Sequence, residues 1–95
     1  MPGRPPLLAD DVVEGALTEL QWIRNGNRLE KTVKRADFAG AMRFVNAVAE
    51  LAEEADHHPD ITIAWNTVTL ALWTHVSGGI TAADLELAAK IDALG

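Results

Sequence analysis

The sequence lacks cysteine altogether, which excludes a disulfide framework and thiolate chemistry in this chain of 95 residues. Basic side chains are also scarce. Eight lysines and arginines stand against fourteen aspartates and glutamates, for a formal net charge of −6. Because such a chain has no general electrostatic attraction to phosphate backbones or anionic lipid, nucleic acid and membranes are poor candidate partners. The composition suits a reducing compartment, and we expect a cytoplasmic location.

Long apolar runs are missing as well, since no stretch approaches the roughly 20 apolar residues that cross a bilayer. The segment from Met1 to Leu8 has three prolines, a glycine and an arginine, and it lacks the apolar core of a signal peptide. We therefore expect a flexible N-terminal lead-in over residues 1–8 and a single domain over residues 9–95. A domain of this size is near the lower limit for a self-sufficient core, so we also predict a homodimer or a homotetramer.

The first part of the domain reads as a helix followed by a hairpin. Asp10 or Asp11 can cap the helix, whose apolar side chains recur at three- and four-residue steps, and we expect it to end near Trp22. Residues 22–24 and 28–33 then read as two short strands. Between them a glycine flanked by asparagines tolerates the positive φ of a tight turn, which predicts a β-hairpin.

A long helix is predicted over residues 37–55, where apolar side chains recur with helical spacing. It must end before Pro59, because proline disfavours helical geometry in the residue before it. Residues 61–65 and 68–75 then alternate between apolar and polar, which predicts two strands around a turn at residues 66–67.

A last helix is predicted after Thr81, with Asp84 completing a capping box. The resulting order is α-β-β-α-β-β-α. We therefore predict an α+β fold with a four-stranded antiparallel sheet and the helices packed on one face. The open sheet face and the edge strands would be left for a partner subunit.

Groups able to move protons near neutral pH gather in one region. The sequence has three histidines: His57 and His58 precede Pro59 on the loop that leaves the long helix, and His75 follows at the end of the last strand. The pKa of a free imidazole is about 6.5, so both its acid and its base forms are available. Nearby carboxylates, supplied by Glu53 and Asp56, favour the charged form. One ring can then act as the acid while another remains the base.

Other interpretations of these residues stay open. A histidine pair at a helix end can simply interact with terminal carbonyls and the helix dipole. His57 or His58 with His75 and a carboxylate can be drawn as a metal site, although the spacing matches no familiar zinc pattern. The three tryptophans, Trp22, Trp65 and Trp73, are typical of core or interface packing, with Trp73 expected on the same strand face as His75.

A set of residues in this sequence resembles the signature of the pterin-4a-carbinolamine dehydratases, and the resemblance extends from about Leu8 to the end of the sequence. The matching residues are Glu53, Asp56, His57, His58, Pro59, Trp65, Thr74, His75, Gly78, Gly79, Ile80, Thr81 and Asp84. The resemblance implies a hydro-lyase that removes water from 4a-hydroxytetrahydrobiopterin, or a related pterin, to give the quinonoid dihydropterin. It implies no metal and no further cofactor, and a pterin as the small-molecule partner.

The resemblance also assigns site residues. It implies that His57, His58 and His75 are catalytic, without separating the acid from the base. The implied substrate-binding residues are Glu53, Asp56, Pro59, Trp73, Thr74, Val76, Ser77 and Asp84. Thr74, Val76 and Ser77 are expected to act mainly through backbone groups, and Asp84 from the rim.

Three positions depart from the family pattern. Ala83 stands where some relatives have arginine, and Trp73 where relatives usually have a small hydroxyl residue, so the identity of the pterin is less constrained than the reaction class. Trp65 fills an aromatic position that is commonly tyrosine, which is a lesser change. Two other functions are carried as alternatives. One is a non-catalytic binding or assembly-chaperone module, and the other is an unrelated small histidine enzyme or metal binder.

Overall fold

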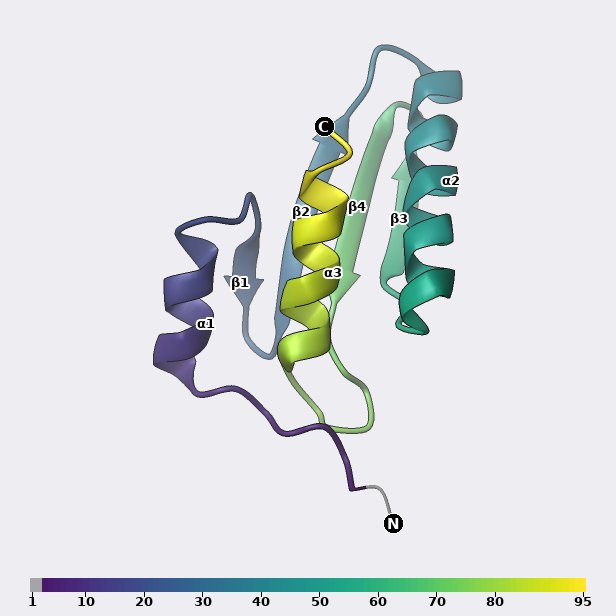
Figure 1. Cartoon of the computed structure of the whole chain (residues 1–95). Coiled ribbons are helices and arrows are strands. Elements are labelled where there is room, and N and C mark those ends of the chain that lie inside the picture. The colour runs from purple at the N-terminus through teal and green to yellow at the C-terminus, as the bar shows by residue number, and fades with distance from the viewer. Residues whose placement is uncertain (1–2) are drawn as a thin grey trace.

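A computed structural model describes residues 3–95 (Figure 1). It confirms the predicted order of elements. These are α1 (Asp10–Leu17), β1 (Ile23–Asn25), β2 (Arg28–Lys34), α2 (Phe38–Ala55), β3 (Asp60–Ala64), β4 (Thr67–Leu72) and α3 (Ala82–Asp92). The four strands form one antiparallel sheet in the order β1-β2-β4-β3, and the helices lie on one side of it (Figure 1). The α+β fold class is therefore as predicted.

The register of the sheet separates an apolar face from a polar one. Leu29 of β2 pairs with Leu72 of β4, and both are fully buried beneath the helices. Successive side chains of a strand alternate between the two faces. On the open face Thr32, Thr69 and Thr62 pair across β2, β4 and β3, and all three are exposed. The uncovered face is thus a polar surface, which water can solvate.

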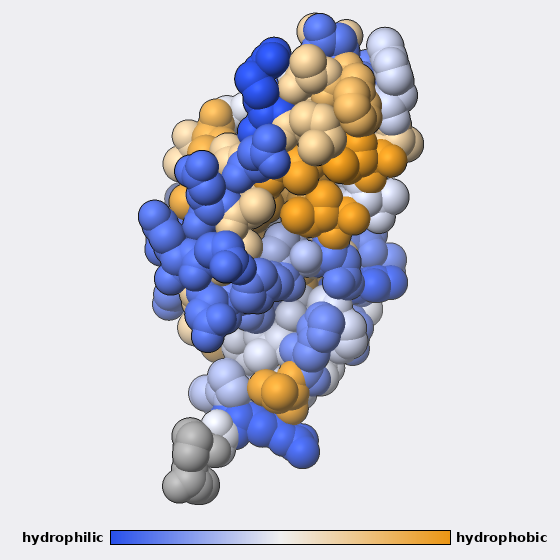
Figure 2. All heavy atoms as spheres, turned by 90° about the vertical axis from the view of Figure 1, so that its right-hand side faces the viewer, coloured by the Kyte–Doolittle hydropathy of each residue, from blue (hydrophilic) through white to orange (hydrophobic). Residues whose placement is uncertain are grey.

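Exposed apolar side chains lie instead at the side of the molecule formed by α2 and the β3–β4 hairpin. Phe38 of α2, Ile61 and Ile63 of β3, and Trp65 in the hairpin loop are all exposed. Figure 2 views the molecule from this side and shows apolar side chains gathered in its upper half. Because β3 ends the strand order, its outer edge has no strand partner within residues 3–95.

The first helix is shorter than predicted. Its N-cap is Ala9, Asp10 is its first residue, and it ends at Leu17 instead of continuing to Trp22. Long-range hydrogen bonds explain the early end. The indole Nε1 of Trp22 donates to Asp92 Oδ1 at 2.9 Å, and the backbone N–H of Gln21 donates to Asp92 Oδ2 at 2.8 Å. These bonds to the end of α3 require a non-helical chain before β1, and Trp22 is buried in the core as expected.

Both predicted hairpins are present, each with a shift of one residue. In the first, β1 covers Ile23–Asn25 instead of residues 22–24, Asn25 pairs with Arg28, and Gly26 has the positive φ of 64° that the turn requires. In the second, Ala64 pairs with Thr67, so the turn lies at residues 65–66, one residue earlier than predicted.

Contacts with another segment explain this shift. The side-chain amide of Asn66 donates to Arg35 O at 2.9 Å, while Arg35 N–H donates to Asn66 O at 2.8 Å. These bonds hold Asn66 at the turn. Trp65 consequently adopts a φ of 51° and is 65% exposed, so it lies outside the strand and outside the core, while packing at an interface stays a prediction.

The N-terminal segment contacts the loop that follows β4. Leu8 N–H donates to Ile80 O at 3.0 Å, and Ser77 Oγ donates to Pro5 O at 2.6 Å. Met1 and Pro2 lie outside the described residues, and the flexibility of residues 1–8 stays a prediction. Within residues 3–95, no helix is both long and apolar enough to span a membrane.

Candidate active site

A left-handed turn at the end of α2 positions the first two histidines. Asp56, the residue after the helix, has φ 50° and ψ 43°, and its N–H bonds back to the last turn. His57 N–H also donates to Ala52 O, at 3.1 Å. This geometry satisfies terminal carbonyls while reversing the chain. His57 and His58 therefore lie on the short connection to β3, off the helix, as predicted.

A tight loop beyond β4 positions the third histidine. Thr74 N–H donates to Gly79 O at 2.8 Å in an isolated antiparallel bridge, which closes a loop over residues 75–78. Gly78 has a φ of 72°, a conformation that favours glycine. The side-chain amide of Asn27, in the first hairpin, donates to Gly78 O at 3.1 Å. The backbone that carries His75 is thereby fixed to the sheet.

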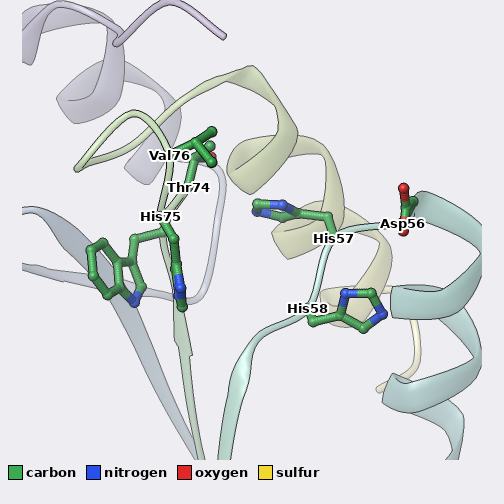
Figure 3. Close-up of a pocket in the computed structure, with 7 residues that line it drawn as sticks. Asp56, His57, His58, Thr74, His75 and Val76 are labelled. Atoms are coloured by element: carbon green, nitrogen blue, oxygen red, sulfur yellow. The ribbon is translucent and has the colours of Figure 1, made fainter. Parts of the chain in front are cut away.

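The two segments meet at one cavity of about 260 Å³ (Figure 3). In the figure, His57 and His75 stand on opposite sides, while the ring of His58 turns toward α2. The lining residues are Asp56, His57, His58, Trp73, Thr74, His75 and Val76. The structure therefore brings together all three histidines, which are separated by up to 18 positions in the sequence.

His57 is held by a buried carboxylate. Its Nε2 lies 2.5 Å from Oδ1 of Asp84, which has no solvent exposure. The other oxygen, Oδ2, accepts hydrogen bonds from Thr81 N–H at 2.8 Å and from Thr74 Oγ1 at 2.9 Å. An ionised carboxylate can only accept, so the hydrogen of the His57 bond belongs to Nε2. Nδ1 is then the nitrogen of this ring that can exchange a proton with a ligand.

His58 has a different partner. Its Nε2 lies 2.6 Å from Oε2 of Glu53 on the last turns of α2, and both side chains are largely exposed. Ion pairs between exposed groups contribute little to stability, because water screens them and both side chains lose rotamer freedom. Glu53 orients the ring of His58 without enclosing it.

The aromatic contact of His75 comes from Trp73, and both residues lie beyond β4, which ends at Leu72 and not at residue 75 as predicted. The ring of Trp73 packs against that of His75 with a centroid distance of 4.2 Å, so the two side chains lie on the same side of the chain, as expected, although outside the strand. Trp73 Nε1 also donates to Oδ2 of Asp60, at 3.4 Å. Asp60 was not singled out in the sequence, because a single acid at the start of a strand carries no local signal.

The remaining predicted residues take different places. Asp56, Trp73, Thr74 and Val76 line the cavity with the histidines. Glu53 contacts His58, Pro59 follows the histidine pair, and Ser77 turns toward Pro5. Asp84 lies behind His57, with no exposure through which to reach a ligand directly. Thr81, predicted only as a helix cap, also bonds to Thr74.

A metal centre was one interpretation of these residues. Within residues 3–95, no group of three or more histidine, cysteine or acidic side chains is arranged to hold a metal ion. The carboxylates nearest to the histidines are instead paired with single imidazole nitrogens.

Known proteins share both the sequence and this architecture. The family model for pterin 4 alpha carbinolamine dehydratase matches residues 6–94. A protein of Roseiflexus castenholzii is 51% identical over 87 residues, covering 90% of this chain and 94% of its own length. A protein of Nocardia farcinica is 47% identical over 89 residues, covering 93% of this chain and 94% of its own length. Both are provisionally named pterin-4-alpha-carbinolamine dehydratases.

Two solved structures resemble the fold. A transcriptional coactivator/pterin dehydratase from Brucella melitensis superposes with a TM-score of 0.89 at 32% identity, covering 94% of this chain and 98% of that one. A pterin dehydratase-like protein identified as a RuBisCO assembly factor in the alpha-carboxysome gives a TM-score of 0.63 at 28% identity, covering 79% of this chain and 87% of that one. By the family match and by identity over nearly its whole length, this chain belongs to the pterin-4-alpha-carbinolamine dehydratase family.

Proposed function

We propose that the protein is a 4a-hydroxytetrahydrobiopterin dehydratase, which removes water from a 4a-hydroxytetrahydropterin and so supports tetrahydrobiopterin recycling. The observation that carries the proposal is the meeting of three imidazoles at one cavity, with Nε2 of His57 bound to a buried carboxylate. Family membership supports the same reaction class.

The reaction needs one proton donor and one proton acceptor. As the C4a–oxygen bond breaks, an acid protonates the departing oxygen, and water leaves. The lone pair of the adjacent ring nitrogen forms the C=N bond, and a base takes the proton from that nitrogen. His57 and His75 face the cavity from opposite sides, so one ring can give a proton while the other takes one (Figure 3). We leave the two roles unassigned between them.

The cavity walls suit a flat bicyclic guest. The indole of Trp73 offers an aromatic surface beside His75, and Val76 is an exposed apolar side chain at the same cavity. Aromatic rings favour offset stacking with one another. Because Trp73 is larger than the small hydroxyl residue usual in relatives, it is also the residue that we expect to influence which pterin fits.

We further propose that the protein is a homodimer or homotetramer. In the part of the chain that the structure describes, the outer edge of β3 has no strand partner, and Ile61 and Ile63 on that strand are exposed. An exposed edge with apolar side chains and unused backbone hydrogen-bonding groups favours pairing with another strand. The polar open face of the sheet lacks such a driving force. A cytoplasmic location stays a prediction.

A non-catalytic assembly role is the second candidate function. It is favoured by the likeness to the dehydratase-like RuBisCO assembly factor. A scaffold, however, has no physical need for three imidazoles at one cavity or for a buried carboxylate behind one of them. The two functions differ in one measurable respect, which is acceleration of pterin dehydration.

The deciding experiment follows the decay of chemically generated 4a-hydroxytetrahydropterin. We expect the wild-type protein to accelerate it, and His57→Ala, His58→Ala and His75→Ala to reduce the acceleration. A folded wild type without effect would overturn the enzymatic proposal in favour of the assembly role. Full activity in the triple variant would overturn the choice of residues while leaving the reaction in place.

A further inference from the structure

A small cluster of buried polar side chains begins at the cavity wall, which Thr74 lines. Thr74, Thr81 and Asp84 are 6%, 1% and 0% exposed. Buried polar groups are costly unless each has a hydrogen-bond partner. Within residues 3–95, no buried side-chain nitrogen or oxygen lacks one. The cluster is therefore a completed network, and the identity of each donor can be derived.

The hydrogen bonds of the network run in one direction. Asp84 Oδ2 accepts from Thr74 Oγ1, which uses the only hydrogen of the Thr74 hydroxyl. The 2.7 Å contact between the two threonine hydroxyls must then have Thr81 as its donor. The donated hydrogen bonds therefore run from Thr81 to Thr74 and from Thr74 to Asp84. The other carboxylate oxygen of Asp84, Oδ1, accepts from His57 Nε2.

This network does more than a helix cap requires. A capping box needs only the first residue, Thr81, and the acid three positions later, Asp84. Thr74 lies just beyond β4, is the neighbour of His75, and is not needed by the helix. Its hydroxyl joins the segment that carries His75 to the carboxylate that holds His57.

We propose that Thr74 and Thr81 are positioning residues for the dehydration reaction. Their hydroxyls fix the Asp84 carboxylate with Oδ1 toward His57, which keeps the neutral imidazole in the Nε2–H form with Nδ1 free for the substrate. The catalytic part of this inference rests on the proposed function, whereas the positioning part concerns the free protein and can be measured without substrate.

The experiment compares wild type with Thr74→Val, which removes the hydroxyl at nearly constant shape, and Thr74→Ser, which restores it. Nitrogen-15 NMR of the histidine rings reports the tautomer of His57 in the substrate-free protein. We expect wild type and Thr74→Ser to hold the Nε2–H form, and Thr74→Val to show a mixture. By analogy with the hydrogen-bond partners of metal-bound histidines, kcat of Thr74→Val should fall by about 10- to 100-fold, with KM within about twofold.

Three results would overturn the inference. The first is an Nδ1–H tautomer of His57 in folded wild type, a measurement that needs no variant to fold. The second is an unchanged tautomer and kcat in folded Thr74→Val. The third is equal impairment of Thr74→Ser and Thr74→Val, which would assign the effect to packing. If wild type lacks activity but shows the expected tautomers, the proposed function fails while the positioning of His57 stands.

Discussion

The indole of Trp73 packs against the imidazole of His75, with the two ring planes tilted by 34°. The same indole donates to Asp60 at the start of β3, so it is held from both sides. His75 itself is exposed on a loop, where a free side chain would sample several rotamers. The contact with Trp73 restricts the orientation of the ring at the cavity wall.

Replacing Trp73 with serine should weaken substrate binding and loosen His75. Aromatic pairs contribute about 0.5–1.5 kcal/mol beyond burial, which corresponds to about a two- to tenfold change in an equilibrium constant. We expect kcat/KM of Trp73→Ser to fall within about this range for a tetrahydrobiopterin-derived substrate. Steady-state kinetics of the dehydration measure it.

The matched control is Trp73→Phe, which keeps an aromatic ring but removes the hydrogen bond to Asp60. This variant should retain most of the activity. If Trp73→Ser is as active as wild type toward several pterins, the stack has no role in binding or in orienting His75.

The buried Asp84 predicts a separation of activity from folding. Asparagine in its place cannot satisfy the site, because its amide N–H₂ faces either the donors Thr81 and Thr74 or the donor His57 Nε2. If the amide N–H₂ faces Thr81 and Thr74, buried donors face one another without an acceptor. If it faces His57, it donates to Nε2 and favours the Nδ1–H tautomer, which is the wrong one. In serine proteases, the equivalent loss of the correct tautomer lowers kcat by about 10⁴. We expect a loss of about 10²-fold or more for Asp84→Asn.

Stability should fall by about 1–3 kcal/mol in the same variant, the usual cost of an unsatisfied buried group. Urea unfolding monitored by tryptophan fluorescence measures it. Glu86→Gln, an exposed acid on the same helix, is the control and should change neither quantity. Wild-type kcat in Asp84→Asn would exclude a role for this carboxylate in holding His57.

How far the sequence predicts this site depends on the distance over which residues interact. The end of α2 and the start of α3 follow from local signals, namely Pro59 beyond the first helix and the capping box of the second. The predicted end of α1 was wrong because Trp22 donates a hydrogen bond to Asp92, 70 positions away. Helical periodicity contains no information about such a partner.

The pairing of acids with histidines also depends on contacts between residues that are distant in the sequence. Glu53 and Asp56 are the acids that the sequence predicts as partners of the histidine pair, and Glu53 does contact His58. The partner of His57 is Asp84, 27 positions away. The left-handed turn at Asp56 directs His57 toward α3, while the carboxylate of Asp56 stays at the end of α2 (Figure 3). The resemblance named the residues, but only the fold assigns the pairs.

The pair formed by Glu53 and His58 should contribute little to folding. Both side chains are largely exposed, and exposed ion pairs are worth about 0–1 kcal/mol. Glu53→Gln should therefore leave the urea midpoint almost unchanged. Its effect on kcat should be smaller than that of Asp84→Asn, since Glu53 orients a ring that solvent already reaches. A larger kinetic effect for Glu53→Gln would make His58, and not His57, the ring whose orientation limits the reaction.

The edge of β3 predicts how the chain associates. Ile63→Lys places a charge on an exposed edge strand, a substitution that opposes strand pairing between proteins. Thr32→Lys, on the exposed face of the interior strand β2, is the matched control with the same added charge. We expect sedimentation velocity at micromolar concentration to show an oligomer for wild type and Thr32→Lys, and a shift toward monomer for Ile63→Lys. Dissociation by Thr32→Lys alone would place the interface on the polar sheet face, and a monomeric wild type would remove the predicted assembly altogether.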